Sequence, residues 1–226
     1  MIVWGGLPPG TRLVEIELEQ QLDVSRTPIR SALNRLVAEG HVVSSGGRKE
    51  FLKVAPLSRD DAIELFEMVG HLESIPARTV ALLEPKARAE IAAKLRACNR
   101  EIAKADKARQ SDASQLFDLD ARFHQVFVDA GAGPKLHKHL QLLHSQVERY
   151  DRLYMSAYFR HLEPTLAEHE RIAGAIQRGD ADAAETAVRL NWTNSGERLT
   201  VVIGAVGGGG TWRPGPLRPE TGRLSR

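Results

Sequence analysis

Two residues near the middle of the chain have the types and the spacing to hold a metal ion. Asp120 and His124 lie four positions apart in the segment FDLDARFH. On a helix this spacing puts both side chains on one face, about one turn apart. A carboxylate and an imidazole so placed can bind one divalent cation. An isolated pair of this kind is more often an exposed hydrogen bond, so the spacing alone leaves both interpretations open.

Further polar residues that could join such a site come later in the chain. His169, in AEHE, and Asn191, in RLNW, both fall in segments with helical periodicity. His137, His139 and His144 are spaced like a metal cluster, but they lie in the lysine-rich opening of a helix. We expect these three histidines on a solvated helix face rather than in a site.

The elements that must position these side chains are helices. Residues 57–202 have apolar side chains at helical spacing almost throughout, and no segment alternates long enough to suggest a sheet. Pro85 and Pro134 suit the first turns of two helices, and Gly179 suits the end of another. This pattern predicts an all-helical antiparallel bundle.

A different pattern marks the N-terminal part, where residues 18–43 predict a helix-turn-helix. Residues 23–25 are typical of a tight turn in which Ser25 caps the second helix. One face of that helix is apolar. The other face carries polar and basic side chains, namely Arg26, Thr27, Arg30, Asn34 and Arg35. Such side chains at the start of a helix suit contacts with the bases and phosphates of double-stranded DNA.

Two short apolar runs follow this helix and predict a β-hairpin wing. They cover residues 41–43 and 51–54, and the glycine-rich turn between them carries Arg48 and Lys49. The alternative is an ordinary amphipathic helix pair with a solvated arginine face. The net charge of +2, from 31 basic and 29 acidic residues, does not decide between the two. The wing, and a helix without acidic residues before Glu39, favour DNA binding.

The rest of the composition bounds the class of protein. The chain has no run of about 18 apolar residues and no signal peptide pattern, and its one cysteine, Cys98, cannot form an internal disulfide. These features favour a cytoplasmic protein. Residues 204–226 contain four consecutive glycines and three prolines, a composition that predicts a disordered tail.

The N-terminal part resembles a known family. Residues 7–13, 24–36 and 38–40 are similar to the DNA-binding domain of GntR-family regulators. The resemblance implies dimers on short pseudo-palindromic operators. Together with the basic wing tip, it points to these DNA contacts: Ser25, Arg26, Thr27, Arg30, Gly46, Gly47, Arg48 and Lys49. Ser31 stands where the family usually has Glu, and the chain begins within or just after the family's first helix, which we therefore expect to be truncated.

The helical part resembles the FCD ligand-binding domain that follows such DNA-binding domains in one branch of the family. Its pattern is an Asp-x-x-Phe-His helix, a later Glu-His and a final His, which together bind a metal. Asp120, His124 and His169 match this pattern, while the final histidine aligns with Asn191. The resemblance implies a divalent metal, zinc first, with nickel or manganese as alternatives. Because an amide oxygen is a weak ligand for zinc or nickel, the role of Asn191 is doubtful.

The resemblance also implies a small organic acid as the effector. Many members have an Arg four residues before the glutamate that matches Glu73, and here that position is Val69. Arg149, Arg152 or His71 could bind the carboxylate instead. A metal ion with open positions would itself bind a carboxylate oxygen.

Together these observations predict a mainly α protein. A winged helix-turn-helix domain occupies residues 1–56, a helical domain for effector, metal and dimer contacts occupies 57–203, and a tail occupies 204–226. The predicted function is a ligand-responsive, homodimeric, DNA-binding transcriptional regulator, a repressor rather than an enzyme. The alternatives are a metal-dependent hydrolase that uses Asp120, His124 and His169, or a DNA-binding protein without an effector.

Overall fold

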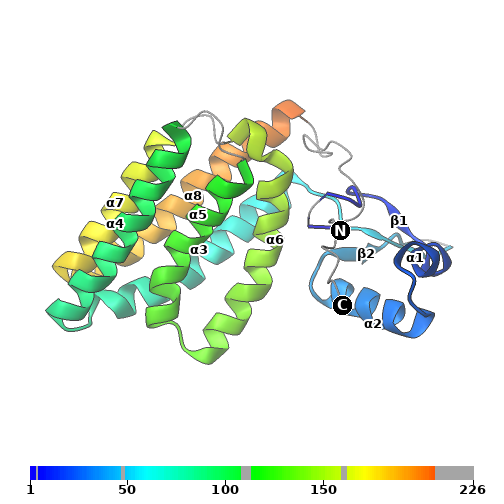
Figure 1. The fold of residues 1–226 in the computed structure, drawn as a ribbon, viewed down its shortest axis with the longest axis horizontal. Helices are drawn as coiled ribbons and strands as arrows, with labels where there is room; N and C mark the ends of the chain where they lie inside the picture. Colours follow the sequence, from blue (N-terminus) through cyan, green and yellow to red (C-terminus); the bar gives the residue numbers. More distant parts are fainter. Residues whose placement is uncertain (4, 47–48, 108–112, 159–161, 207–226) are drawn as a thin grey trace, which may run out of the picture.

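The computed structural model describes residues 1–3, 5–46, 49–107, 113–158 and 162–206. A small N-terminal unit of helices and a sheet lies beside a larger unit made of helices (Figure 1). This arrangement confirms the predicted fold class, a winged helix-turn-helix followed by an antiparallel helical bundle. Gly47, Arg48 and most of the expected tail lie outside the described residues.

The N-terminal unit contains α1 (Glu15–Leu22), α2 (Arg26–Ala38) and the strands β1 (Arg12–Leu13), β2 (Val42–Ser44) and β3 (Leu52–Val54). The strands form an antiparallel sheet in the order β1-β3-β2. The expected wing corresponds to β2 and β3, whereas β1 was not anticipated, because two residues are too short to show a periodicity.

In the core of this unit, α1 and α2 pack against the sheet. Leu18, Leu33, Val42 and Val54 are all buried in one cluster. Asp23 adopts a left-handed backbone conformation (φ 54°), which produces the tight turn between the two helices. Ser25 stands at the N-cap position with an extended backbone, but its side chain makes no capping hydrogen bond.

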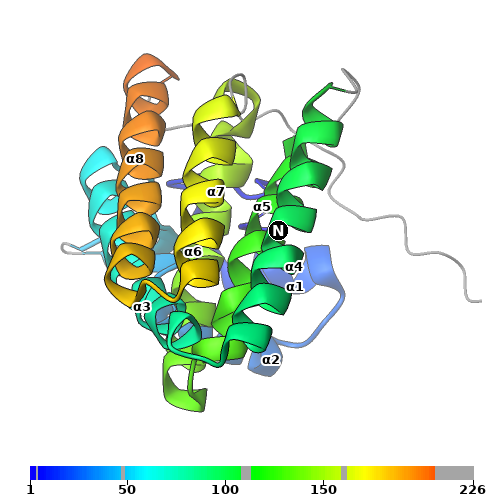
Figure 2. The same cartoon turned by 90° about the vertical axis from the view of Figure 1, so that its left-hand side faces the viewer.

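The larger unit is built from helices α3 (Arg59–Ala81), α4 (Pro85–Lys107), α5 (Ala113–Gly131), α6 (Pro134–Tyr158), α7 (Glu163–Arg178) and α8 (Ala181–Val206). Helix α8 lies along α3, and α7 lies along α4 (Figure 2). Pro85 and Pro134 open their helices, and Gly179 ends α7 in the left-handed conformation (φ 75°). Helix α8 runs to Val206, three residues beyond the expected end of this domain. No helix of the described chain is long and apolar enough to span a membrane.

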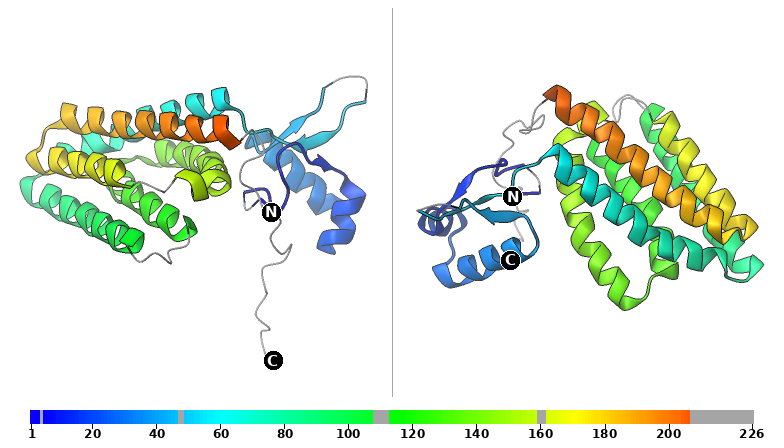
Figure 3. Two further views of the ribbon diagram at one scale, coloured as in Figure 1. Left: turned by 90° about the horizontal axis from the view of Figure 1, so that it is seen from above. Right: turned by 180° about the vertical axis from the view of Figure 1, so that it is seen from behind.

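The two units meet along α6, near the segment 55–58 that links them (Figure 3). His41 Nε2 lies 3.1 Å from Ser145 Oγ, and Tyr150 donates to the carbonyl oxygen of Ser58 at 3.2 Å. Arg149 donates to the carbonyl oxygen of Ala55. Helix α6 therefore carries the contacts through which the bundle holds the N-terminal unit.

Candidate metal centre and DNA-binding surface

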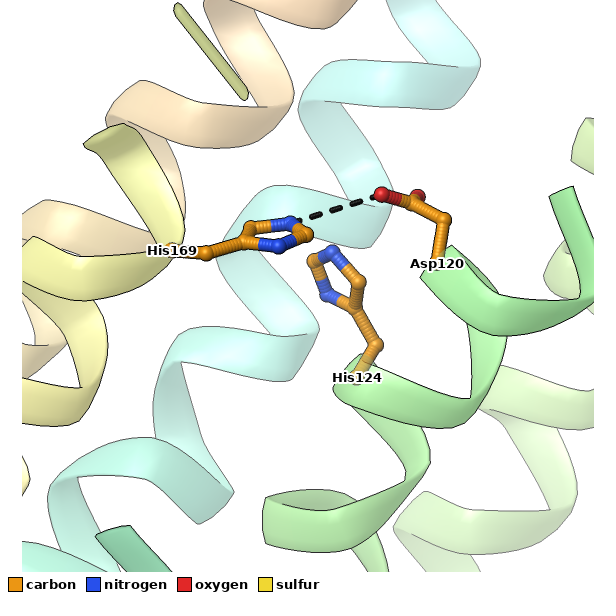
Figure 4. A group of neighbouring side chains, drawn as sticks. All are labelled: Asp120, His124 and His169. Carbon is orange, nitrogen blue, oxygen red and sulfur yellow. Dashed lines mark ion pairs between the residues drawn. The ribbon is translucent and has the colours of Figure 1, made fainter. Parts of the chain in front are cut away.

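Three predicted ligands come together inside the bundle. Asp120 and His124 project from α5, and His169 projects toward them from α7 (Figure 4). One ligand atom from each residue lies within 4.8 Å of the others. Both imidazoles are buried, and His169 stacks on Phe123 with ring centroids 3.7 Å apart. The helical spacing of Asp120 and His124 thus places both side chains on the face of α5 toward which His169 projects.

The electrostatics of this cluster fit a cation between the three side chains. Asp120 Oδ1 and His169 Nε2 lie 3.4 Å apart, and neither of these buried atoms has a hydrogen-bond partner in the described chain. Burial, and then the charges of His124 and Arg198, lower the pKa of His169, so its imidazole is neutral. Burial raises the pKa of Asp120, and a carboxyl oxygen that faces an imidazole lone pair is unfavourable without a cation or a proton between them, because buried polar atoms are nearly always paired. A divalent metal would satisfy both.

Each imidazole is oriented by a hydrogen bond that its Nδ1 donates to a residue outside the cluster. His124 Nδ1 donates to Glu73 Oε2 at 2.6 Å. Asn99 donates its amide to the carbonyl oxygen of Leu166, so Asn99 Oδ1 accepts from His169 Nδ1 at 3.1 Å. Both histidines therefore keep Nε2 for a metal, as the outer partners of metal-binding histidines commonly ensure.

Glu73 is the centre of this supporting network, which the sequence analysis did not identify. Its side chain is fully buried and also binds His144 Nε2 and Trp192 Nε1, each at 2.7 Å. Burial alone would raise the pKa of Glu73, but the charge and hydrogen bond of His124, with those of His144, lower it strongly. Burial alone would lower the pKa of His124, but the charge and the hydrogen bond of Glu73 raise it.

The expectation that His144 lies on a solvated face is wrong, because this residue faces Glu73 and stacks near Trp192. A signal was present: His144 shares a helix face with Leu140 and Val147, which are buried. His139 is exposed and bonds to a backbone carbonyl oxygen of its own helix. His137 pairs at the surface with Asp129 at 3.0 Å.

Asn191 is buried and donates its amide to Glu168 Oε2 at 3.0 Å, in a network with Arg198. The amide nitrogen is therefore committed to Glu168. In the described chain no hydrogen bond joins Asn191 to Asp120, His124 or His169. A fourth ligand role for Asn191 stays a prediction.

A cavity of about 380 Å³ opens beside the cluster. Its polar lining consists mainly of acids and histidines: Glu73, Asp118, Asp120, His124, His144, Glu148 and Asp151. Among the described residues no arginine or lysine lines it. Burial, and then the charges of Asp120 and Glu148, raise the pKa of Asp151 well above its usual range. Within the described part of the chain, the histidines are therefore the only side chains of this lining that can carry a positive charge.

The three candidate carboxylate-binding residues lie elsewhere. Arg149 lines a cavity between the two units. Arg152 pairs with Glu148 at 2.6 Å and with Asp118 at 3.3 Å. Both acids line the cavity beside the cluster, which we call the metal-side cavity. His71 is exposed on α3. None of them lines the cavity beside the metal ligands.

Helices α1 and α2 lie at the end of the molecule away from α4 and α7 (Figure 1). Ser25 and Thr27 are exposed at the start of α2, and Gly46 and Lys49 are exposed at the wing. Arg26 pairs with Glu19 at 3.0 Å and Arg30 pairs with Glu15 at 2.8 Å, pairs that the sequence analysis did not anticipate.

These ion pairs do not withdraw the arginines from the surface. The side chains of Arg26 and Arg30 have relative exposures of 55% and 65%. Exposed pairs of this kind contribute only about 0–1 kcal/mol, so a DNA phosphate can replace the carboxylate at little cost. The start of α2 is therefore exposed and could enter a groove of DNA.

Comparison with known proteins agrees with both parts of this structure. Residues 1–50 match the model of "Bacterial regulatory proteins, gntR family", and residues 64–193 match the FCD domain. The chain is 30% identical over 146 residues to the Nta operon transcriptional regulator of Aminobacter aminovorans, an alignment that covers 62% of each chain. It is 25% identical over 205 residues to an uncharacterized HTH-type transcriptional regulator, YdhC, of Bacillus subtilis, covering 90% and 88%.

Solved structures share the fold. Escherichia coli McbR/YncC superposes with a TM-score of 0.66 at 18% identity, covering 90% of this chain and 92% of the other. A GntR regulator from Rhodococcus sp. RHA1 superposes with a TM-score of 0.61 at 21% identity, covering 90% and 92%. With an FCD match over more than half of its length, the chain belongs to the gntR family of bacterial regulatory proteins, in the branch with an FCD domain, and is a transcriptional regulator.

Proposed function

We propose that this regulator is a homodimeric, cytoplasmic repressor that binds a pseudo-palindromic operator and responds to a small carboxylate. The carboxylate would bind at a divalent metal held by Asp120, His124 and His169. The observation that carries the metal proposal is the pair of buried, unpartnered atoms, Asp120 Oδ1 and His169 Nε2, that face each other. One relative, from Paenarthrobacter nicotinovorans, is described as a probable D-xylose utilization operon transcriptional repressor, which favours the repressor role.

The metal, zinc with nickel or manganese as alternatives, would supply open coordination positions for a carboxylate oxygen. This role follows from the cavity, which in the described chain has no arginine or lysine to neutralise an acid. Asn191 remains a candidate for a fourth, weak ligand. Glu73 and Asn99 hold the two imidazoles in the required tautomer.

On the DNA side, we propose that Arg26, Arg30 and Lys49 neutralise phosphates and that the start of α2 enters the major groove. Ser25, Thr27 and the wing residues Gly46, Gly47 and Arg48 would complete the contact. Two such units in a dimer would read the two half-sites of the operator.

Helix α6 provides the route by which a ligand can change the operator affinity. His144 and Ser145 both line the metal-side cavity, and Ser145 also bonds to His41 of the DNA-binding unit. A ligand that favours one position of α6 would bias the position of the DNA-binding unit, which is a coupling free energy between the two sites.

The experiment is a gel shift with an operator fragment, using full-length protein with and without a chelator. We expect elemental analysis to find about one metal per chain in the wild type and in His139→Ala, an exposed control, and to find it lost in His124→Ala. Candidate acids should change operator affinity only in the metal-loaded proteins. Metal-free wild-type protein with an unchanged response to acids would refute the proposed site.

The same preparation tests the hydrolase alternative. Glu73 is the carboxylate bonded to His124, and its two oxygens are already committed to three donors, so it is poorly placed to act as a general base. Turnover of ester or amide substrates that disappears in His124→Ala would favour the hydrolase.

A further inference from the structure

A second cavity, of about 500 Å³, lies between the DNA-binding unit and the bundle. Both units contribute charged and polar side chains to its lining, among them His41, Lys53, Asp61, Glu64, Arg149 and Tyr150. It is separate from the metal-side cavity, with which it shares none of its lining residues. A ligand held here would touch the DNA-binding unit and helices α3 and α6 at once.

Arg149 is the unusual residue of this cavity. Its side chain is buried, with a relative exposure of 3%, and its guanidinium donates a hydrogen bond to the carbonyl oxygen of Ala55. Its Nε has no hydrogen-bond partner, and no carboxylate of the described residues forms an ion pair with its guanidinium. Burial lowers its pKa to about 10, so the group still carries its charge at neutral pH. A buried, unpaired charge is costly and is normally matched by an anion.

His41 lies in the same cavity and is also 3% exposed. Ser145 Oγ donates to the carbonyl oxygen of Leu142 at 2.7 Å, so it accepts from His41 Nε2 at 3.1 Å. His41 Nδ1 then carries a lone pair and is an acceptor, and it has no hydrogen-bond partner in the described chain. Burial, followed by the positive charge of Arg149, lowers the pKa of His41 and keeps this imidazole neutral. A ligand with a hydrogen-bond donor would satisfy this acceptor, as buried polar atoms normally require.

We propose that this interdomain cavity is a second ligand site for a small oxyanion that carries its own hydroxyl group. The oxyanion pairs with Arg149, and the hydroxyl donates to His41 Nδ1. The exposed carboxylates of Asp61 and Glu64 disfavour a ligand with several negative charges. A 2-hydroxycarboxylate and dihydrogen phosphate share this chemistry. Bound there, either would stabilise the DNA-binding unit in its position on α6. The inference does not depend on the proposed metal centre.

The test is thermal unfolding and calorimetric titration of the full chain with glycolate and phosphate, in parallel with acetate and sulfate. Acetate is the matched control for glycolate because it lacks the hydroxyl, and sulfate is the control for phosphate because it lacks the proton. At a tenfold excess over Kd we expect glycolate or phosphate to raise Tm by about 3–6 °C. The member of the pair that binds identifies the source of the oxyanion. We expect the partner without the donor to bind about tenfold more weakly.

Three variants locate the binding. Arg149→Met, which keeps the length of the side chain without its charge, should lose the ligand-dependent shift, whereas His124→Ala should keep it. In His41→Phe the preference for glycolate over acetate should fall to about one, a readout that remains useful if Arg149→Met does not fold. A shift that survives in Arg149→Met but disappears in His124→Ala would place the ligand at the metal ligands and overturn the proposal. Equal binding of acetate and glycolate by the wild type would also overturn it.

Discussion

Glu73→Gln should weaken metal binding by about 10- to 100-fold and leave the fold intact. Glu73 Oε2 accepts from both His124 and Trp192, and Oε1 accepts from His144. A glutamine has the same size, and its oxygen can take the Oε2 position. Its amide then faces His144, which can accept a hydrogen bond as a neutral imidazole. The substitution therefore removes chiefly the negative charge behind His124.

The magnitude follows from the role of that charge. Removing the outer partner of a metal-binding histidine costs about 10- to 100-fold in affinity, which corresponds to about 1.4–2.8 kcal/mol. Deleting one member of a buried ion pair typically costs about 3–5 kcal/mol of folding stability. Since glutamine keeps the hydrogen bonds and loses the desolvation cost of a buried carboxylate, the free energy of unfolding should change by less than that.

Competition with a chromophoric chelator measures the metal Kd, and thermal unfolding of the metal-free protein measures the stability. Glu67→Gln is the matched control, because Glu67 is an exposed glutamate on the same helix. An unchanged metal Kd in Glu73→Gln, with metal binding lost in Asp120→Asn, would refute the idea that Glu73 tunes the site. A large loss of stability without a change in Kd would assign Glu73 to folding alone.

Three further predictions concern DNA binding, packing and pH. Arg26→Ala should weaken operator binding strongly and reduce the slope of log K against log salt by about 1, because one phosphate contact is lost. A gel shift series at several salt concentrations measures both quantities. An unchanged affinity would contradict the proposed docking of α2 in the groove. Gly70→Ala should cost about 1–3 kcal/mol in thermal unfolding, since an added Cβ would lie 2.9 Å from Trp192 Cβ, whereas Gly133→Ala has open space and serves as the control. Although burial alone would lower the pKa of His124, the charge of Glu73 raises it, so a metal competes with a proton for this imidazole and metal affinity should rise with pH as the imidazole loses its proton. Calorimetry in buffers of different ionisation enthalpy counts the released protons. A metal affinity that does not change with pH, with no proton released, would contradict this reasoning.

The elements were predictable because their signals are local. Apolar periodicity marked the bundle, and Pro85, Pro134 and Gly179 marked helix ends where the structure has them. Within one helix, the spacing of Asp120 and His124 already placed both side chains on a common face. The match of His169 came from the family pattern, since nothing in the spacing along the chain joins it to residues about 45 positions earlier.

The partners of these residues are set by contacts between helices far apart in the sequence. Glu73 belongs to α3, yet it bonds to His124 on α5, His144 on α6 and Trp192 on α8. A buried carboxylate shows no pattern in sequence beyond its place on an otherwise apolar face. Packing of the four helices created the charge environment that makes the site suited to a metal.

The amino-acid sequence by itself determined the two-part architecture, the basic start of α2 and the common helix face of Asp120 and His124, because each depends on signals within single helices and turns. Only the tertiary structure decided which buried polar atoms of the described chain lack a hydrogen-bond partner, among them Asp120 Oδ1, His169 Nε2, His41 Nδ1 and Arg149 Nε. Burial and pairing depend on how separate helices and the two units pack, and such packing leaves little local trace along a chain.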